Sequence, residues 1–274
     1  MIDRSLIESA IERANSIFKI RVPVRNTSKR LFIGPARCDF MKDSVELIPA
    51  FIEEYCSKFN SEEKLITHAI CHEFGHAKES RYFAQGEIFP FYLKISKVFK
   101  ITKPIAVSLH SLSKPIGYIM NGLIDYSIDC ELKDYGIKNV AARYKINLIY
   151  KYLLSKNSAK KKSAETEKLQ ALFNLTIDIG YYDFAELTNP EKEVIVDYYK
   201  YNELFEKWSS IKSIMKSRHF CEVDNFYETM QSLFLELLGI TISTNSHSLA
   251  ELITKFSSSP SFWKKDVYNL LYLG

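Results

Sequence analysis

Two histidines four residues apart, in the stretch His72-Glu73-Phe74-Gly75-His76, constrain this chain more than any other feature. On an α-helix this spacing places both imidazoles on one face, where they can hold one Zn²⁺ ion. Glu73 is rotated by about 100° from His72, so its carboxylate lies beside the ion and can take a proton from the water bound there. The motif therefore predicts a helix with His72 and His76 as zinc ligands and Glu73 as the catalytic base.

The residues around this motif also favour a helix. Asn60 and Glu63 match a capping box for a helix that runs to about Arg81. Gly75 leaves room for the approach of another helix or of a substrate backbone. The helix has a predicted buried side, which consists of Leu65, Ile66, Ala69, Ile70 and Ala77.

The rest of the chain predicts a small sheet and many helices. A helix is expected over 2–18, and alternation in Phe18–Val22, in Arg30–Ile33 and across a hairpin from Ala36 to Leu47 predicts a small antiparallel sheet. Further helices are expected over 88–102, 105–113, 116–134, 140–155, 164–179, 190–212, 223–238, 247–257 and 261–272. We therefore expect an α+β fold that is mainly α-helical, with the sheet beside the metal helix and an all-helical C-terminal half.

Composition excludes several classes of protein. With 9 Gly and 8 Pro in 274 residues, the chain has about half the usual content of each, which argues against a turn-rich sandwich or barrel. The net charge of +4 is shared evenly by the two halves, so we expect no nucleic-acid partner. The chain shows neither a signal peptide nor a long apolar stretch, and its five cysteines include no C-x-x-C pair. These features predict a cytoplasmic protein without a membrane partner.

A catalytic zinc ion needs a third protein ligand. The metzincin pattern would require glycine and histidine where this sequence has Glu79 and Tyr82, so that pattern is excluded. Asn121, Asp125 and Asp129 instead form a polar stripe on an otherwise apolar helix. A cation with its imidazoles would satisfy these polar groups if the stripe is buried, whereas an exposed helical face would leave them in water.

The two motifs together resemble the zincin metallopeptidases in their gluzincin-like arrangement. The pattern N-x-x-x-D-x-x-I-D-x-E-L, which begins at Asn121, also resembles prokaryotic putative metallopeptidase domains. The resemblance implies that Asp125 is the third zinc ligand, that Asp129 orients a ligand histidine, and that Asn121 supports them. Gluzincins use glutamate as the ligand, so the shorter Asp125 would need the two helices closer together. A second interpretation makes Asp129 the ligand.

The resemblance covers residues 1–136, which we expect to form a zincin-like core with one zinc ion per chain. Residues 137–274 would form a helical region of unknown role, packed on the core as one domain or separate from it. The predicted function is a zinc-dependent endopeptidase that uses a Glu73-activated, zinc-bound water on a peptide or protein substrate. The alternative is a binding or regulatory protein with an inactive or latent zincin site, acting through its helical half.

Other residues have less specific predicted roles. His68 extends the histidine row by one turn, and we interpret it as a satisfied polar residue at the helix start rather than as a group that contacts the site or the substrate. The substrate is expected to add a strand along the hairpin edge near Asp43–Leu47. The sequence does not define the oligomeric state, and it does not select among four candidates for stabilising an oxyanion, which are Tyr126, Tyr135, Arg143 and His219.

Overall fold

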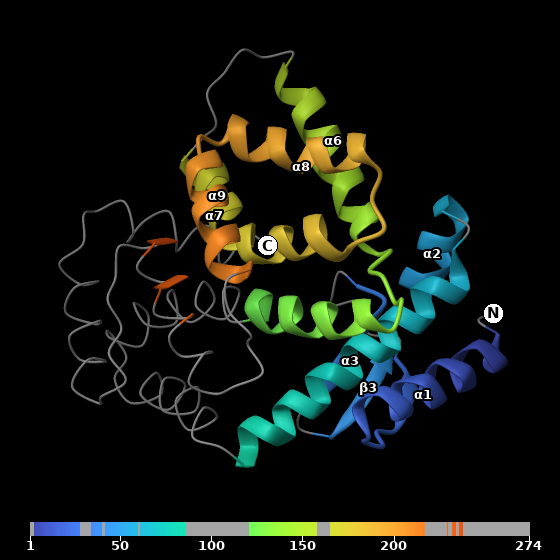
Figure 1. Ribbon diagram of the computed structural model, residues 1–274. Coiled ribbons are helices and arrows are strands. Elements are labelled where there is room, and N and C mark those ends of the chain that lie inside the picture. The colour runs from blue at the N-terminus through green and yellow to red at the C-terminus, as the bar shows by residue number, and fades with distance from the viewer. Residues whose placement is uncertain are drawn as a thin grey trace, which may run out of the picture. The chain divides into compact units, whose positions relative to one another are not determined.

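The computed structural model describes residues 3–27, 34–39, 42–59, 61–85, 121–157 and 165–216, together with 229, 232, 233, 236 and 237. Figure 1 shows long helices and one small sheet, so the predicted α+β class with a mainly helical chain is confirmed. No helix in these ranges is long and apolar enough to cross a bilayer. Several predicted features lie outside the described residues, namely the strand Arg30–Ile33, the helices over 88–102, 105–113, 247–257 and 261–272, and His219.

The chain divides into two compact units, each assembled from separate stretches of sequence. The first unit comprises Met1–Gly86, Ile124–Leu154 and Gly180–Val194. The second unit comprises Glu87–Leu123, Ser155–Ile179 and Ile195–Gly274. Residues on both sides of the predicted boundary between 136 and 137 therefore contribute to the first unit.

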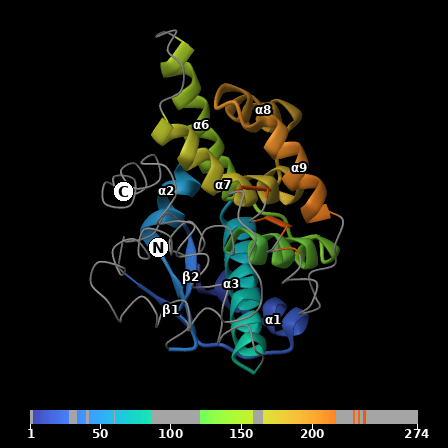
Figure 2. The same ribbon diagram turned by 90° about the vertical axis from the view of Figure 1, so that its left-hand side faces the viewer.

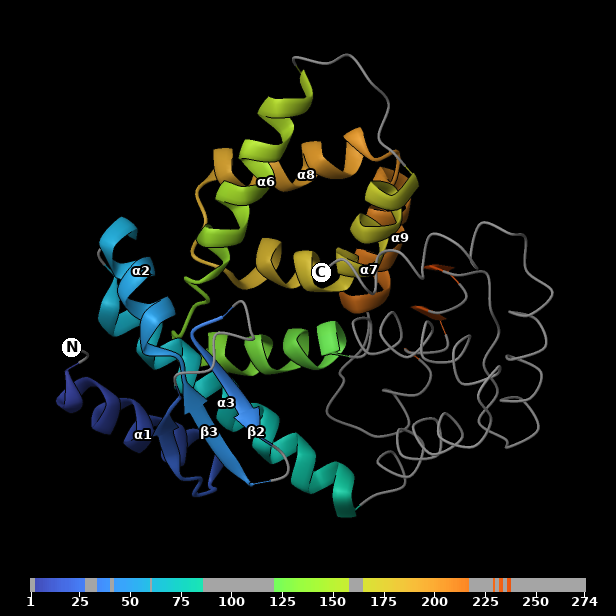
Figure 3. The same ribbon diagram turned by 180° about the vertical axis from the view of Figure 1, so that it is seen from behind.

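The first unit begins with helix α1 (Arg4–Phe18), which confirms the helix predicted over 2–18. The side chain of Asp3 caps its N-terminus by accepting a hydrogen bond from the Ser5 backbone N–H. Lys19 adopts a left-handed conformation with φ of 57° and ends the helix. The buried face of α1 packs against helix α3 (Glu62–Gln85; Figure 3); it consists of Ala10, Ala14, Ile17 and Phe18.

The sheet contains strands β1 (Val24–Asn26), β2 (Ala36–Asp39) and β3 (Ser44–Leu47) in the order β1-β3-β2. The predicted hairpin of β2 and β3 is confirmed as antiparallel, but β1 runs parallel to β3, so the sheet is mixed rather than antiparallel. The predicted strand at Phe18–Val22 is wrong. Phe18 continues the buried helical stripe of α1, and the first strand begins only after Pro23.

The middle position of β3 excludes one expectation about the substrate. Val45 is paired with Val24 of β1 on one side and with Cys38 of β2 on the other. The predicted substrate edge near Asp43–Leu47 is therefore wrong, because both sides of this strand already carry a partner. All four residues of β3 are buried, and the sheet packs along α3 through β2 and β3 (Figure 2).

Two helices follow the sheet. Helix α2 (Pro49–Phe59) begins with a proline, whose fixed φ suits the first turn of a helix. It buries Ile52 and Tyr55, and the Tyr55 hydroxyl donates a 2.6 Å hydrogen bond to the Val140 carbonyl. Helix α3 (Glu62–Gln85) is the predicted metal helix and runs one turn beyond Arg81. The predicted capping residue Asn60 lies outside the described residues.

The helical residues 121–134 belong to the helix predicted over 116–134. They are followed by α6 (Ala142–Asn157), which confirms the helix predicted over 140–155. In the first unit, Ile128 and Leu132 join the core that α1, the sheet and α3 form. The loop after helix α7 (Glu165–Phe184) also contacts the start of α6, where Asn139 and Ala185 form an isolated parallel bridge.

The described part of the second unit is helical. The predicted helix over 190–212 is two helices, α8 (Asn189–Tyr201) and α9 (Phe205–Lys216). The break follows from the backbone, since Glu203 has a left-handed φ of 56° and the Leu204 N–H turns back to the Tyr199 carbonyl at 2.8 Å. Tyr199 is fully buried, and its hydroxyl donates to Asp178 Oδ2 at 2.7 Å.

Candidate metal centre

Three histidines follow one another along one face of α3. His68, His72 and His76 are each one helical turn apart, so their side chains stack in a row. The ring centroids are 5.3 Å apart for His68 and His72, and 4.9 Å apart for His72 and His76. The three side chains are only 5%, 13% and 10% exposed, respectively. The predicted pair of histidines is thus part of a row of three, in which His68 and His76 are buried and His72 is partly buried.

Two aspartates on the helical residues 121–134 face this row. Asp125 Oδ1 lies 2.9 Å from His76 Nε2 and 3.4 Å from His72 Nε2. Asp129 Oδ1 lies 2.8 Å from His72 Nδ1 and 3.0 Å from His68 Nε2. His72 therefore presents one ring nitrogen to each aspartate. The structure brings together four of the predicted site residues, namely His72, His76, Asp125 and Asp129.

A close approach of the two helices accounts for the reach of the short aspartate side chain. Gly75 lies on α3 between His72 and His76, and it packs against Ile128 of the facing helix. A Cβ atom at Gly75 would lie 2.6 Å from Ile128 Cγ2, which is too close for any side chain to be tolerated without movement. The absence of a side chain at this position lets Asp125 contact the histidines.

Asp129 is the most buried acid of the site, with 5% of its side chain exposed. A carboxylate can only accept hydrogen bonds, so the Nδ1 atom of His72 carries the proton in their contact. The other ring nitrogen of His72, Nε2, faces Asp125. This is the usual arrangement of a ligand histidine and the carboxylate that orients it.

The charges of the aspartates and histidines support one another. Burial alone would lower the pKa of His72, but Asp129 and Asp125 outweigh it and raise this pKa well above its usual value. Burial alone would raise the pKa of Asp125, yet His72 and His76 hold it below its usual range. The pKa of Asp129 is also held far below its usual range, since His72 and His68 outweigh the effect of burial. Both carboxylates are therefore kept ionised by the histidines that they contact.

Glu73 follows His72 on α3 and is half-buried. Its carboxylate makes no hydrogen bond or ion pair within the part of the chain that the structure describes. Asp125 and Asp129, in contrast, are both engaged with histidines. The Glu73 oxygens are thus available to accept a proton, as a general base requires.

The donor set fits a zinc ion. The ligand atoms of His72, His76 and Asp125 all lie within 4.8 Å of one another. Two imidazole nitrogens and one carboxylate oxygen make up the three-ligand set of a catalytic zinc site. A second group, which consists of His68, His72 and Asp129, meets the same distance limit. The first group contains both histidines of the H-E-x-x-H motif, and its aspartate is 22% exposed against 5% for Asp129. A catalytic zinc ion needs an open position, so the first group is the better candidate.

The candidates for oxyanion stabilisation are engaged elsewhere or exposed. The buried hydroxyl of Tyr126 donates to Asp183 Oδ2 at 3.2 Å. Arg143 forms an ion pair with Glu191, with 3.4 Å between Nε and Oε1. Tyr135 is 49% exposed, and its main-chain oxygen accepts a hydrogen bond from Arg13. None of these contacts assigns the role to any of the three.

Asn139 contacts the site although its sequence position did not predict it. Its Nδ2 atom donates to Asp129 Oδ2 at 3.4 Å, and its Oδ1 atom accepts from the Ala142 N–H at the start of α6. An asparagine three residues before a helical N–H can cap the helix with its side-chain oxygen, but no sequence pattern connects Asn139 with Asp129. Asn121, in contrast, is exposed where the described part of its helix begins, so its supporting role stays a prediction.

Comparisons with protein-family models, with characterised proteins and with solved structures give no match to this chain. The side chains of the site are therefore the guide to function. The ligand atoms of two histidines and one aspartate lie close together, and the half-buried Glu73 follows His72 in the sequence.

Proposed function

We propose that the chain is a zinc-dependent endopeptidase in which His72, His76 and Asp125 hold one zinc ion. One observation carries this proposal. The Nε2 atoms of His72 and His76 approach the same Asp125 oxygen, at 3.4 Å and 2.9 Å, and Glu73 follows His72 on the same helix. The resemblance of residues 1–136 to the zincins supports peptide hydrolysis as the reaction and a peptide or protein as the substrate.

A bound zinc ion would polarise the scissile carbonyl and lower the pKa of its water toward neutrality. Glu73 accepts the proton from the attacking water and passes it to the leaving amine. Asp129 holds a proton of His72 on Nδ1, so that Nε2 would be the nitrogen that binds the metal. Each of these roles is consistent with the burial and contacts of the residue that fills it.

We also propose that the protein acts in the cytoplasm. Four cysteines within the described residues are free thiols, namely Cys38, Cys56, Cys71 and Cys130. Free thiols are typical of a reducing compartment. Fractionation of cells that express the chain would test this proposal, and recovery in a secreted fraction would contradict it.

Replacement of Glu73 by glutamine tests the proposed enzyme. Glutamine keeps the size of the side chain but cannot accept the proton at neutral pH. Zinc content should stay at about one ion per chain, because Glu73 is not a ligand. Cleavage of an unstructured protein substrate should fall by about 10²–10⁴-fold, the usual effect of losing a general base. Metal analysis and a peptide-library cleavage assay measure the two quantities.

Glu63→Gln is the matched control, since Glu63 lies on the same helix and is exposed. This variant should cleave as fast as wild type. Equal cleavage by zinc-loaded wild type and Glu73→Gln would contradict the proposed mechanism. A zinc-loaded wild type that cleaves nothing would favour the alternative, a binding or regulatory protein that zinc stabilises.

A further inference from the structure

The carboxylate of Asp129 accepts hydrogen bonds from three side chains. Oδ1 accepts from His72 Nδ1 at 2.8 Å and from His68 Nε2 at 3.0 Å. Oδ2 accepts from Asn139 Nδ2 at 3.4 Å. Only the contact with His72 belongs to the proposed metal chemistry, and the other two donors come from a different turn of α3 and from the loop before α6.

We propose that His68 and Asn139 are positioning residues, which act on the metal through Asp129 and His72. This inference rests on the proposed function, because it concerns the orientation of a proposed zinc ligand. With a donor on each oxygen, the Asp129 carboxylate cannot rotate without leaving a buried donor unpaired, which is costly. A carboxylate fixed in this way keeps a His72 proton on Nδ1, so that Nε2, which faces Asp125, is the nitrogen that would give up its proton to a metal ion.

The burial of His68 identifies it as a donor to Asp129. The residue is 4% exposed, and its Nδ1 atom has no hydrogen-bond partner within the described ranges. A single ring proton on Nδ1 would be an unsatisfied buried donor, whereas on Nε2 it meets the Asp129 carboxylate. The tautomer of His68 is therefore the one that donates to Asp129. The interpretation of His68 as a satisfied polar residue agrees with this contact, but it did not predict that the partner belongs to the site.

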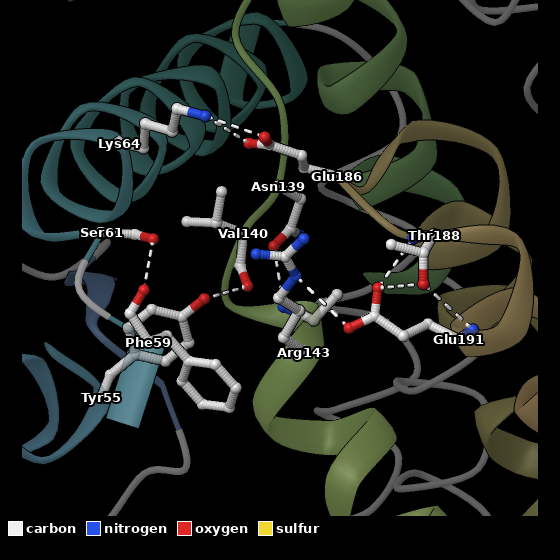
Figure 4. Close-up of polar contacts among 11 residues, drawn as sticks. Tyr55, Phe59, Ser61, Lys64, Asn139, Val140, Arg143, Glu186, Thr188 and Glu191 are labelled. Carbon is white, nitrogen blue, oxygen red and sulfur yellow. Dashed lines mark hydrogen bonds and ion pairs between the residues drawn. The ribbon is translucent and has the colours of Figure 1, made fainter. Parts of the chain in front are cut away.

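Asn139 connects the metal centre with residues of the predicted helical half. Its Oδ1 accepts from the Ala142 N–H at 3.2 Å, and its backbone carbonyl accepts from the Glu186 N–H at 3.0 Å. Figure 4 shows Asn139 beside Glu186, whose carboxylate contacts Lys64 of α3. These contacts fix the side-chain amide that donates to Asp129. Residues after 137 thus contribute to the orientation of the site.

Hydrogen bonding explains the group of His68, His72 and Asp129 better than a second metal ion does. His72 belongs to both groups. If its Nε2 atom holds the proposed zinc ion, a second ion on Nδ1 would make His72 a bridging imidazolate without a ring proton, and Asp129 would no longer orient it. The two nitrogens lie 2.8 Å and 3.0 Å from the carboxylate oxygen, which are ordinary distances for charge-assisted hydrogen bonds. The number of zinc ions bound distinguishes the two interpretations.

The experiment compares His68→Leu with His68→Gln in the full chain. Glutamine can donate from a position close to that of His68 Nε2, whereas leucine fills the space without donating. Zinc affinity, measured by competition with a chelator, should fall by about 10–100-fold for leucine and stay within a few-fold of wild type for glutamine. In metal-free protein, NMR should detect a slowly exchanging Nδ1 proton of His72 in wild type and in the glutamine variant, and rapid exchange in the leucine variant.

Asn139→Ser and Asn139→Ala separate positioning from helix capping. Serine caps a helix as asparagine does but is too short to reach Asp129, and alanine does neither. Both variants should bind zinc more weakly by a similar factor of about 10–100, and only alanine should also lower thermal stability through the lost cap. Weaker zinc binding in Asn139→Ala alone would assign the effect to capping and overturn the role of Asn139.

Two results would overturn the positioning role of His68. One is wild-type zinc affinity and an unchanged His72 proton in His68→Leu, which would leave the proposed zinc site intact. The other is two zinc ions in wild type and one in His68→Leu, which would make His68 a ligand. A wild-type chain that binds no zinc would instead contradict the proposed function itself, and the metal-free NMR comparison would still show whether His68 orders His72.

Discussion

His72 contacts both aspartates of the site, because its two ring nitrogens face different carboxylates. Nε2 lies 3.4 Å from Asp125 Oδ1, and Nδ1 lies 2.8 Å from Asp129 Oδ1. The aspartate on the Nε2 side shares its oxygen with His76, as a ligand would, and the other aspartate accepts the Nδ1 proton. The geometry therefore favours Asp125 over Asp129 as the third zinc ligand.

Alanine substitutions separate the two aspartates. Asp125→Ala removes a proposed ligand and should abolish most zinc binding, whereas Asp129→Ala removes only the group that orients His72. A lost orienting carboxylate should weaken zinc binding by about 10–100-fold. Chelator competition with the purified variants measures both effects. The reverse ranking would assign the ligand role to Asp129.

Zinc binding should depend on pH through His72. Its pKa is raised well above the usual value in the metal-free protein, so the ring holds two protons at neutral pH and zinc must displace the one on Nε2. Apparent zinc affinity should therefore rise by about tenfold per pH unit up to this raised pKa and level off above it. Titration calorimetry in buffers of different ionisation enthalpy should detect about one proton released per zinc. An affinity that is constant between pH 6 and pH 8 would contradict the raised pKa.

At the scale of elements, the close contact of α3 with the helical residues 121–134 determines how far apart the histidines and the aspartates lie. Gly75 and Ile128 form this contact within one turn of His72, His76 and Asp125. Because a tightly packed interface cannot absorb an added methyl group freely, the helix separation and the ligand distances should change together.

Gly75→Ala tests this coupling. The added Cβ would lie 2.6 Å from Ile128 Cγ2, so the helices should separate and the fold should lose about 1–3 kcal/mol of stability. Zinc affinity should fall as well, because Asp125 moves away from the histidines. Gly180→Ala in α7 is the matched control, since its Cβ would meet Tyr126 at an ordinary 3.9 Å. Denaturant unfolding and chelator competition should show little change or a small gain in stability for this control.

Secondary structure was predicted well where hydrophobic or polar residues kept one helical or strand spacing. It was predicted less well where turn and helix-start signals follow one another closely. The i, i+4 spacing of His72 and His76 correctly predicted a helix there, and the aspartate spacing predicted that Asp125 and Asp129 share the helix face that meets the histidines. Helix α2 was not predicted, because it begins directly after the hairpin. Its first residue, Pro49, is nevertheless a valid helix-start signal. Asn139 was not predicted because its contact with Asp129 depends on how the chain turns between two helices.

At the scale of the whole molecule, every proposed ligand lies in the first unit. His72 and His76 come from Met1–Gly86, and Asp125 comes from Ile124–Leu154. One ion would therefore join two stretches that are distant in sequence within the same unit. The second unit has buried residues of its own around Tyr199, whose ring lies 4.7 Å from that of Trp208.

Zinc removal should consequently destabilise the two parts of the chain unequally. A ligand that binds only the folded state stabilises it by about 4 kcal/mol at a thousandfold excess over Kd, and this stabilisation belongs to the unit that holds the ligands. Chelation should reduce hydrogen-exchange protection of α3 and of residues 121–134 and leave that of α9 nearly unchanged. His72→Ala is the control, since a chain without the site should respond to chelator in neither region. Equal loss of protection in α3 and α9 would show instead that the two units unfold together, and the zinc site would then stabilise the entire chain.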